Sequence, residues 1–449
     1  MIAAAGWLLA SNLGSQALRL LSNLLLTRLL LPEAFGLVAA ANTLYFALIM
    51  FSDMGVWQSV VRSHGVQTRF LGTAWTVQLL RSALLAAIVL ALALGLEFSR
   101  SAGWFAAGTV YADARLPAIT ALFALSALLQ GLESMKIAIA QRELRTGEIA
   151  RLDLGSQLLA TLVTLLLAWH THSPWALALG SVAGSALRAA GSHLLLPGPF
   201  TRPCWEPQSA RELLSFGQWI FVSSIIGFLA AHGEKLILGA SLQSASFGRF
   251  TIAETLVAAI AGLYASLNGH LVFARLSEAL RTGQSSEANR FYCRAQQGAD
   301  LLLGLLSGTL LLCGQWVVWL LYDPRYREAG WMLQWLGLGL LAMRYQVLEQ
   351  LMFARGQPAL VSANNALRAL ALVLTIPAGY ALAAEAGAIA AVVLSQFAGW
   401  PLALRFKHRQ GLLTRDTELG WLPALATGMA LGWGLDRLLL LALPALATA

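Results

Sequence analysis

The stretch "GLVAAANTLYFALIMFSDMGVWQSVV", residues 36–61, decides the fold. It is almost entirely apolar and longer than the roughly 20 residues that a helix needs to cross the hydrocarbon core of a bilayer. Similar runs recur along all 449 residues, of which 58% are hydrophobic and only 12% charged. The alternating pattern of a membrane β-strand is absent from these runs. The sequence therefore predicts an all-α polytopic membrane protein.

Apolar runs of membrane-spanning length give twelve expected spans and one further apolar stretch. That stretch, residues 419–447, is long enough for one tilted helix or for a tight hairpin that turns at Asp436 and Arg437. One or two extra C-terminal helices are therefore expected. The twelve spans are 6–31, 36–61, 70–96, 117–140, 150–169, 175–196, 212–240, 248–273, 297–321, 330–354, 359–382 and 387–405.

Arginine and lysine concentrate in every second link between the expected spans. By the positive-inside rule these links and the N-terminus face the cytoplasm. The formal net charge of +8 is explained by this topology, so no nucleic-acid partner is expected.

A proline-rich stretch separates two halves of six spans each. The segment "PGPFTRPCWEPQSAR", residues 197–211, contains four prolines and follows the sixth span. We expect an N-terminal lobe over 1–200, a cytoplasmic linker over 201–211 and a C-terminal lobe over 212–406, with the extra membrane segment 419–447 after them.

The two halves carry a weak internal repeat. Residues 30–47, "LLPEAFGLVAAANTLYFA", match residues 242–259, "LQSASFGRFTIAETLVAA", at seven positions that include Phe35 and Gly36. Because each half has six helices, the repeats have the same orientation, which predicts a pseudo-two-fold axis along the membrane normal.

The residues that commonly carry catalysis or bind metals do not form a recognisable pattern. Cys204, Cys293 and Cys313 lie far apart, without the spacing of a zinc site or a disulfide framework. No Walker, GxSxG or HExxH motif is present, and no link exceeds about 20 residues. We expect no catalytic site, no metal and no cofactor, and hence not an enzyme.

Asp53 places a carboxylate inside an expected span, in its inner-leaflet half. A charge at such a depth costs about 2.5–3.5 kcal/mol on insertion scales and usually faces water or a partner. Two interpretations remain open: a pair with a neighbouring arginine that fixes helix packing, or a functional residue that lines a cavity or couples transport to an ion.

Polar side chains line one face of the first expected span. Asn12, Gln16, Arg19, Asn23 and Thr27 fall within about 80° of helical arc. A lipid-facing helix would not tolerate such a stripe, which predicts a water-filled cavity along this face. A hydrogen-bonded packing seam is the alternative.

Several arginines lie too near the middle of their spans to reach water easily. Guanidinium groups bind phosphate in a bidentate manner and stay charged when partly desolvated, so they favour an anionic, phosphate-bearing ligand. The candidate substrate-binding residues are Asn12, Gln16, Arg19, Asn23, Arg81, Arg344 and Arg368, with Arg188 as a further cation at this depth. The candidate ion-coupling residues are the carboxylates Asp53, Glu234 and Glu254.

Several stretches together resemble a known family. The most specific are "LTRLLLPEAFGLVAAANTLYFALIMFSDMGVWQSVVR" (26–62) and "AIAQRELRTGEIARLDLGSQLLATLVTLLLA" (138–168), and weaker ones continue the order to about residue 406. The chain resembles the Wzx-type polysaccharide flippases of the multidrug/oligosaccharidyl-lipid/polysaccharide superfamily. It departs from them at Glu234, where Asp is usual, at Ala240, at Arg249, where an aromatic is usual, and at Ala274, where proline is usual.

The resemblance implies two six-helix lobes around a central cavity in a bacterial cytoplasmic (inner) membrane. It also implies alternating access that moves an undecaprenyl-pyrophosphate-linked oligosaccharide to the outer leaflet, among membrane lipids and with a proton or sodium as a possible coupling ion. Asp53 would then lie at the inner end of the cavity, beside Arg19.

The sequence leaves three alternative functions. A cation-coupled multidrug exporter should favour carboxylates and aromatics over arginines in its cavity. A polytopic glycan polymerase or ligase should carry a large outer loop, whereas the longest on that side, residues 97–116, is poor in candidate catalytic residues. A structural scaffold would not need the polar stripe.

Overall fold

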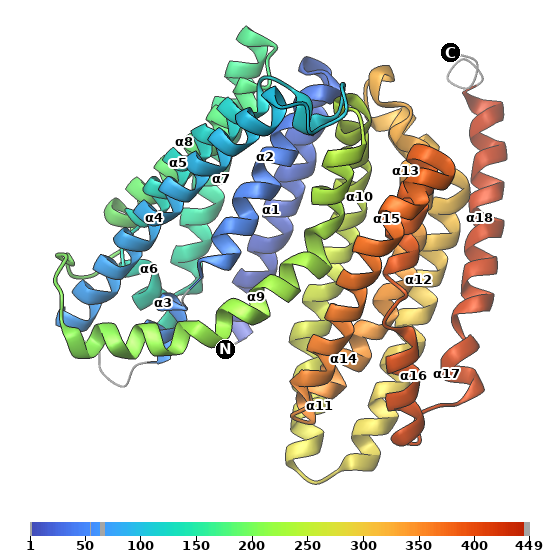
Figure 1. The fold of residues 1–449 in the computed structure, drawn as a ribbon. Helices are drawn as coiled ribbons and strands as arrows, with labels where there is room; N and C mark the ends of the chain where they lie inside the picture. Colours follow the sequence, from blue (N-terminus) through green and yellow to red (C-terminus); the bar gives the residue numbers. More distant parts are fainter. Residues whose placement is uncertain (1, 54, 63–67, 444–449) are drawn as a thin grey trace. The chain divides into compact units, whose positions relative to one another are not determined.

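The computed structural model describes residues 2–53, 55–62 and 68–443, and every regular element of more than one residue in these ranges is a helix (Figure 1). The expectation of an all-α chain is therefore confirmed. The chain divides into two compact units. Unit 1 extends to Phe228 and includes Leu242–Gly248, and unit 2 consists of Leu229–Ser241 and the chain from Arg249 onward.

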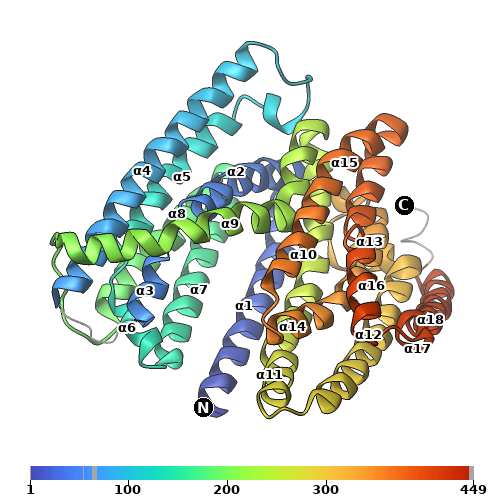
Figure 2. The same cartoon turned by 60° about the horizontal axis from the view of Figure 1, so that its bottom comes forward.

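Unit 1 is a bundle in which α4 lies beside α5, α5 beside α8, α7 beside α8 and α1 beside α7 (Figures 1 and 2). Small buried residues bring these helices close together. A Cβ added at Gly180 of α8, for example, would lie 1.8 Å from the hydroxyl oxygen of Thr164 on α7. The helices are α1 (Ile2–Leu29), α2 (Pro32–Phe51), α3 (Val56–Arg62), α4 (Thr68–Ser101), η1 (Val110–Ala112), α5 (Leu116–Gly131), α6 (Lys136–Arg142), α7 (Thr146–Thr171) and α8 (Trp175–Leu194).

Two helices contribute to both units. α9 (Pro207–Ser241) begins at a proline, which suits the first helical position because a helix leaves that N–H unbonded. Its start lies inside the expected linker 201–211. α10 (Ser244–Leu267) follows it after a short turn. The lobe boundaries expected from the sequence stay a prediction.

Unit 2 is organised around the long helix α12 (Ser285–Leu321), which packs against α13 and α18. Its buried core includes Leu276, Tyr292, Leu348 and Phe406. The remaining elements are η2 (Asn268–Val272), α11 (Phe273–Arg281), η3 (Pro324–Tyr326), α13 (Ala329–Leu338), η4 (Gly339–Tyr345), α14 (Gln346–Ala354), α15 (Pro358–Ser395), α16 (Trp400–Arg409), α17 (Arg415–Leu419) and α18 (Trp421–Ala442).

The chain is a multi-pass membrane protein. In the described residues, 7 helices are long and apolar enough to cross a membrane, or up to 8 if the bent pair of α5 and α6 is one span. This number is smaller than the expected twelve or more because the seven do not include α1, α8 and α9, and because they count the expected spans 359–382 and 387–405 as one. Other expected spans are interrupted. Expected span 36–61 is split into α2 and α3, 117–140 into α5 and α6, and 330–354 into α13, η4 and α14. The expectation of one continuous helix over residues 36–61 is therefore wrong.

The sequence between the expected spans 359–382 and 387–405 forms a tight turn inside α15. Ala383 and Ala384 leave the helical conformation, and Ala384 has φ +47° and ψ −130°. The two arms come back together at small residues, since a Cβ added at Gly379 would lie 2.3 Å from the carbonyl oxygen of Gly387. The expected span 359–382 is thus the first arm of α15, and the expected span 387–405 is divided between its second arm and α16 (Trp400–Arg409).

The last apolar stretch forms one helix, α18, which packs along α12 (Figures 1 and 2). The two helices approach closely through Gly304, Gly308 and Gly428. The Trp316 indole N–H donates to Asp436 Oδ1 at 2.8 Å. Asp436 therefore lies inside a helix, and the alternative of a hairpin turning there is wrong.

Candidate functional site

The first component of the site is the break between α2 and α3. Asp53 Oδ1 accepts the N–H of Gly55 at 3.0 Å, and Gly55 has φ +62°, which glycine adopts easily. An aspartate that bonds its own backbone two residues on favours a turn over a helix. Asp53 thus lies at a helix break rather than in the middle of a span.

Arg81 of α4 holds the end of α2. Its Nη2 donates to the carbonyl oxygen of Ile49 at 3.0 Å and to Ser52 Oγ at 3.1 Å, and its Nη1 lies 3.9 Å from Asp53 Oδ1. A cation at the C-terminal end of a helix stabilises the unpaired carbonyls and the helix dipole. The structure therefore brings two predicted site residues, Arg81 and Asp53, together at one helix end.

The second component is the break between α5 and α6, which are bent by 61° relative to each other. Gln78, one turn before Arg81 on α4, donates its amide to the carbonyl oxygens of Gln130, Gly131 and Glu133 at 3.3, 3.0 and 3.1 Å. These carbonyls lose their helical partners at the break, and non-helical backbone at membrane depth requires such replacement bonds. One face of α4 thus supports both broken helices.

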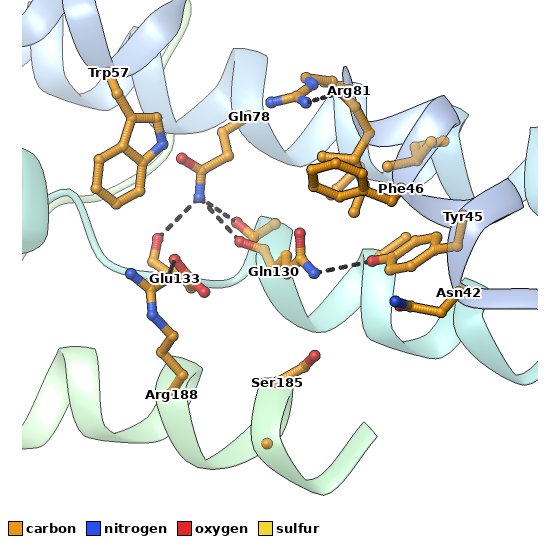
Figure 3. Close-up of a pocket in the computed structure, with 16 residues that line it drawn as sticks. Asn42, Tyr45, Phe46, Trp57, Gln78, Arg81, Gln130, Glu133, Ser185 and Arg188 are labelled. Carbon is orange, nitrogen blue, oxygen red and sulfur yellow. Dashed lines mark hydrogen bonds and ion pairs between the residues drawn. The ribbon is translucent and has the colours of Figure 1, made fainter. Parts of the chain in front are cut away.

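Arg188 of α8 completes this part of the site. Its Nη1 donates to Glu133 Oε2, and its Nε donates to Asp153 Oδ1 at 2.9 Å. Gln130 donates its amide to the hydroxyl oxygen of Tyr45 at 3.0 Å (Figure 3). The two guanidinium groups of this region therefore lie among three carboxylates, those of Asp53, Glu133 and Asp153.

These elements enclose a cavity of about 540 Å³ within unit 1, called here the unit 1 cavity (Figure 3). It lies among α2, α3, α4, α5 and α8, and amides, hydroxyls, charged groups and aromatic rings line it. Its lining includes Asn42, Tyr45, Phe46, Trp57, Gln78, Arg81, Ser82, Gln130, Glu133, Ser185 and Arg188.

A second, smaller cavity of about 190 Å³ lies within unit 2 and is called here the unit 2 cavity. It brings together the predicted residues Glu234, Glu254 and Arg368 from α9, α10 and α15. Glu254 pairs with Lys235 at 2.8 Å, and Glu234 is 8% exposed. The Nε of Arg368 is buried and has no hydrogen-bond partner among the described residues.

Comparison with known proteins gives the family. A model of the family described as "Polysaccharide biosynthesis protein" matches residues 25–331. The chain belongs to this family. None of the proteins with curated descriptions matches the chain.

The fold of this polysaccharide biosynthesis protein is shared with transporters of known structure. It is similar to the lipid II flippase MurJ in an inward closed conformation, with a TM-score of 0.70, 12% identity and coverage of 99% of this chain and 100% of that chain. It is also similar to a multidrug resistance MATE family transporter of the MOP superfamily, with a TM-score of 0.64, 16% identity and coverage of 88% and 95%. The chain thus belongs to a polysaccharide biosynthesis family and has the fold of these membrane transporters.

Arg344 lies in a different environment from the other predicted cations of this family member. It is 2% exposed, bonds both oxygens of Asp300 at 2.6 and 2.8 Å, and donates to the carbonyl oxygen of Thr417 at 2.6 Å. Glu418 lies 3.5 Å from it and also accepts from Lys407, which is fully buried, at 2.5 Å. This network joins η4, α12, α16 and α17, and Arg344 lines neither of the two cavities.

Sequence reasoning did not identify Asp300, Lys407 and Glu418 as members of this network. Asp300 lies just before the apolar run "LLLGLLSG" (301–308), so its carboxylate could have indicated a buried partner.

The polar stripe of α1 lines neither of the two cavities. Arg19 is exposed and has no ion-pair partner within the described part of unit 1, whereas Gln16 and Asn23 are half-buried. Thr27 is fully buried. The side chain of Asn12 lies outside the part of the chain that the structure describes.

Proposed function

We propose that the chain is a flippase that moves a polyprenyl-pyrophosphate-linked oligosaccharide from the cytoplasmic to the outer leaflet of a bacterial inner membrane by alternating access. The observation that carries the proposal is a polar cavity of about 540 Å³ among membrane-spanning helices of a polysaccharide biosynthesis family member. A bilayer-embedded chain retains such polar groups at depth where a hydrophilic ligand or water must pass. Membrane lipids surround the chain, and its substrate carries a lipid tail.

Arg19 is the proposed ligand of the pyrophosphate, with Gln16, Asn12 and Asn23 beside it, and Arg368 in the unit 2 cavity is a separate, second candidate. Arg19 has no carboxylate partner within the described part of unit 1, and Arg368 retains an unbonded buried Nε. A guanidinium with free donors can bind phosphate oxygens, whereas one already bonded to carboxylates cannot do so without leaving them unpaired. Arg81 and Arg344 therefore position parts of the protein and do not bind substrate. Arg81 holds the C-terminal end of α2 in place, and Arg344 joins η4 to α12 through Asp300.

Ion coupling is proposed for Glu234 and Glu254 in the unit 2 cavity and for Asp53 at the α2 break. Glu234 lies in a cavity with Glu254 and Arg368, so binding of a proton or cation there would change the charge balance around Arg368.

Export of cationic drugs is the second candidate function. The balance of carboxylates and guanidinium groups at the unit 1 cavity favours it, as do the aromatic rings of Tyr45, Phe46 and Trp57 in the lining.

Deletion of the chain in its native cell tests the two candidates together. The lipid-linked oligosaccharide is assigned to a leaflet by impermeant labelling, and drug tolerance is measured in parallel. The flippase predicts accumulation on the cytoplasmic face with unchanged drug tolerance. Normal glycan export with new drug sensitivity would contradict the flippase and support the drug exporter.

A further inference from the structure

The unit 1 cavity contains groups that a phosphate does not need. Amide and hydroxyl side chains from different elements converge on it, among them Asn42 of α2, Gln130 of α5 and Ser185 of α8 (Figure 3). Such groups both donate and accept hydrogen bonds. A ligand that matches them must offer donors and acceptors in several directions.

The charges around the cavity argue against a phosphate or pyrophosphate ligand. Arg188 is bonded to Glu133 and Asp153, and Arg81 is bonded to the end of α2 and lies near Asp53. An anion would therefore meet carboxylates as well as guanidinium groups, since both arginines of the described lining already lie near carboxylates. The polar lining is equally unsuited to the polyprenyl tail, so the neutral, polyhydroxylated part of a lipid-linked glycan fits best.

Some polar atoms of the lining are unused. The amide of Asn42 makes no hydrogen bond with any described residue. Gln78 is 7% exposed, and its Oε1 is buried without a hydrogen-bond partner in the described residues. A ligand hydroxyl that bonds the Asn42 amide would use a donor and an acceptor that no described protein group occupies.

Trp57 supplies the apolar surface that a sugar ring requires. It is the second residue of α3, the short helix after the break at Asp53, and its ring lines the cavity (Figure 3). The C–H face of a pyranose packs on an aromatic ring while its hydroxyls bond to polar groups around it. Because Arg81 bonds the end of α2, where the chain turns into α3, it also helps to position Trp57.

We propose that the unit 1 cavity is a glycan subsite, in which Asn42, Gln130 and Ser185 bond sugar hydroxyls and Trp57 packs on a sugar ring. This inference rests on the proposed flippase function and assigns the glycan and the pyrophosphate of one substrate to different places. A volume of about 540 Å³ is within the range of about 300–1,000 Å³ typical of ligand pockets.

The test separates sugar binding from lipid transport. The glycan is released from its native lipid carrier by mild acid, and its binding to the full chain in lipid nanodiscs is followed by saturation-transfer NMR. Asn42→Leu and Trp57→Leu should each weaken binding of the released glycan about tenfold, and Trp57→Phe should retain most of it. Gln334→Leu, which removes an amide from α13 in unit 2, is the matched control and should bind like the wild type.

The possible outcomes show separately whether the glycan subsite exists and whether the chain is a flippase. Wild-type protein that transports the lipid-linked glycan but does not bind the released glycan overturns the subsite and leaves the function intact. Equal binding by wild type, Asn42→Leu and Trp57→Leu, or an equal loss in Gln334→Leu, also overturns it. Glycan binding that Trp57→Leu abolishes, in a chain that moves no lipid, supports the subsite and overturns the flippase.

Discussion

Gly36 and Gly248 pack against each other, so the two glycines that the weak internal repeat aligns are in contact. A Cβ added at Gly36 would lie 2.3 Å from the carbonyl oxygen of Ser244, and one added at Gly248 would lie 1.8 Å from the carbonyl oxygen of Pro32. Glycine at these positions lets the N-terminal turns of α2 and α10 approach backbone to backbone. The repeat thus coincides with a physical contact.

Alanine at either glycine should destabilise the protein. Gly248→Ala should lower the free energy of unfolding by about 1–3 kcal/mol, because the added methyl group would overlap backbone atoms that cannot rotate away. Thermal unfolding of the detergent-solubilised protein measures this change. Gly155→Ala is the control, since nothing lies within 4 Å of a Cβ at that position of α7. Equal melting temperatures for Gly248→Ala and Gly155→Ala would show that the contact is absent.

Gln78→Leu should lower both stability and transport. It removes the donor to three carbonyl groups at the break between α5 and α6. The carbonyl of Gln130 keeps the N–H of Glu133, and each of the other two, left unsatisfied in the buried break, costs about 1–3 kcal/mol. Unfolding in detergent and glycan export in cells are the two measurements. Gln334→Leu loses one long bond, at 3.4 Å, and serves as the control. A Gln78→Leu protein as stable as this control would contradict the role of Gln78 at the break.

Substitutions at Asp53 should distinguish its structural role in the turn, where it accepts the Gly55 N–H, from a role of its negative charge in transport. Asp53→Asn retains an oxygen that can accept the Gly55 N–H, whereas Asp53→Ala removes it, so only the alanine variant should lose about 0.5–1.5 kcal/mol of stability. If the charge couples transport to an ion, Asp53→Asn should remain stable and lose the dependence of transport on the ion gradient. Transport assays with and without a proton or sodium gradient decide this. An Asp53→Asn protein that keeps the gradient dependence of the wild type would exclude a coupling role.

Ala384→Gly should stabilise unit 2. The backbone of Ala384, with φ +47° and ψ −130°, suits glycine and strains an alanine Cβ. We expect a gain of about 1 kcal/mol in the free energy of unfolding. Ala386→Gly, two residues on in the exposed helical arm, should instead lose about 0.5–1 kcal/mol. A stability loss in both variants would mean that the turn is not at Ala383 and Ala384.

The spacing of apolar residues predicts most of the helices, because the length of each run is set by the thickness of the bilayer. It does not predict the breaks. Residues 36–61 are apolar enough for one span, and the turn is held by bonds from the Gly55 N–H to Asp53 and from Arg81 to the end of α2 that hydropathy does not detect. An Asp followed two residues later by Gly was the available local signal.

The sequence predicts which charged residues lie within the expected spans, but it does not predict which of them form ion pairs with one another. Arg81, Arg344 and Arg368 look alike in sequence, and only the fold shows that Arg344 meets Asp300, which lies 44 residues away in the chain. The partners that neutralise an arginine decide whether it can bind a ligand, and those partners come from distant helices. The glycan subsite was missed for the same reason, since its amides and its tryptophan come from different elements.

The most direct measurement is transport by the purified chain in lipid vesicles. The vesicles carry the native lipid-linked oligosaccharide, and an impermeant enzyme or lectin reports the fraction of glycan on the outer face with time. We predict that wild-type protein speeds the exchange between leaflets and that Arg19→Ala, inserted and folded to the same extent, does not. Vesicles with wild-type protein that exchange the lipid no faster than protein-free vesicles would contradict the flippase, and full activity of Arg19→Ala would contradict its proposed site.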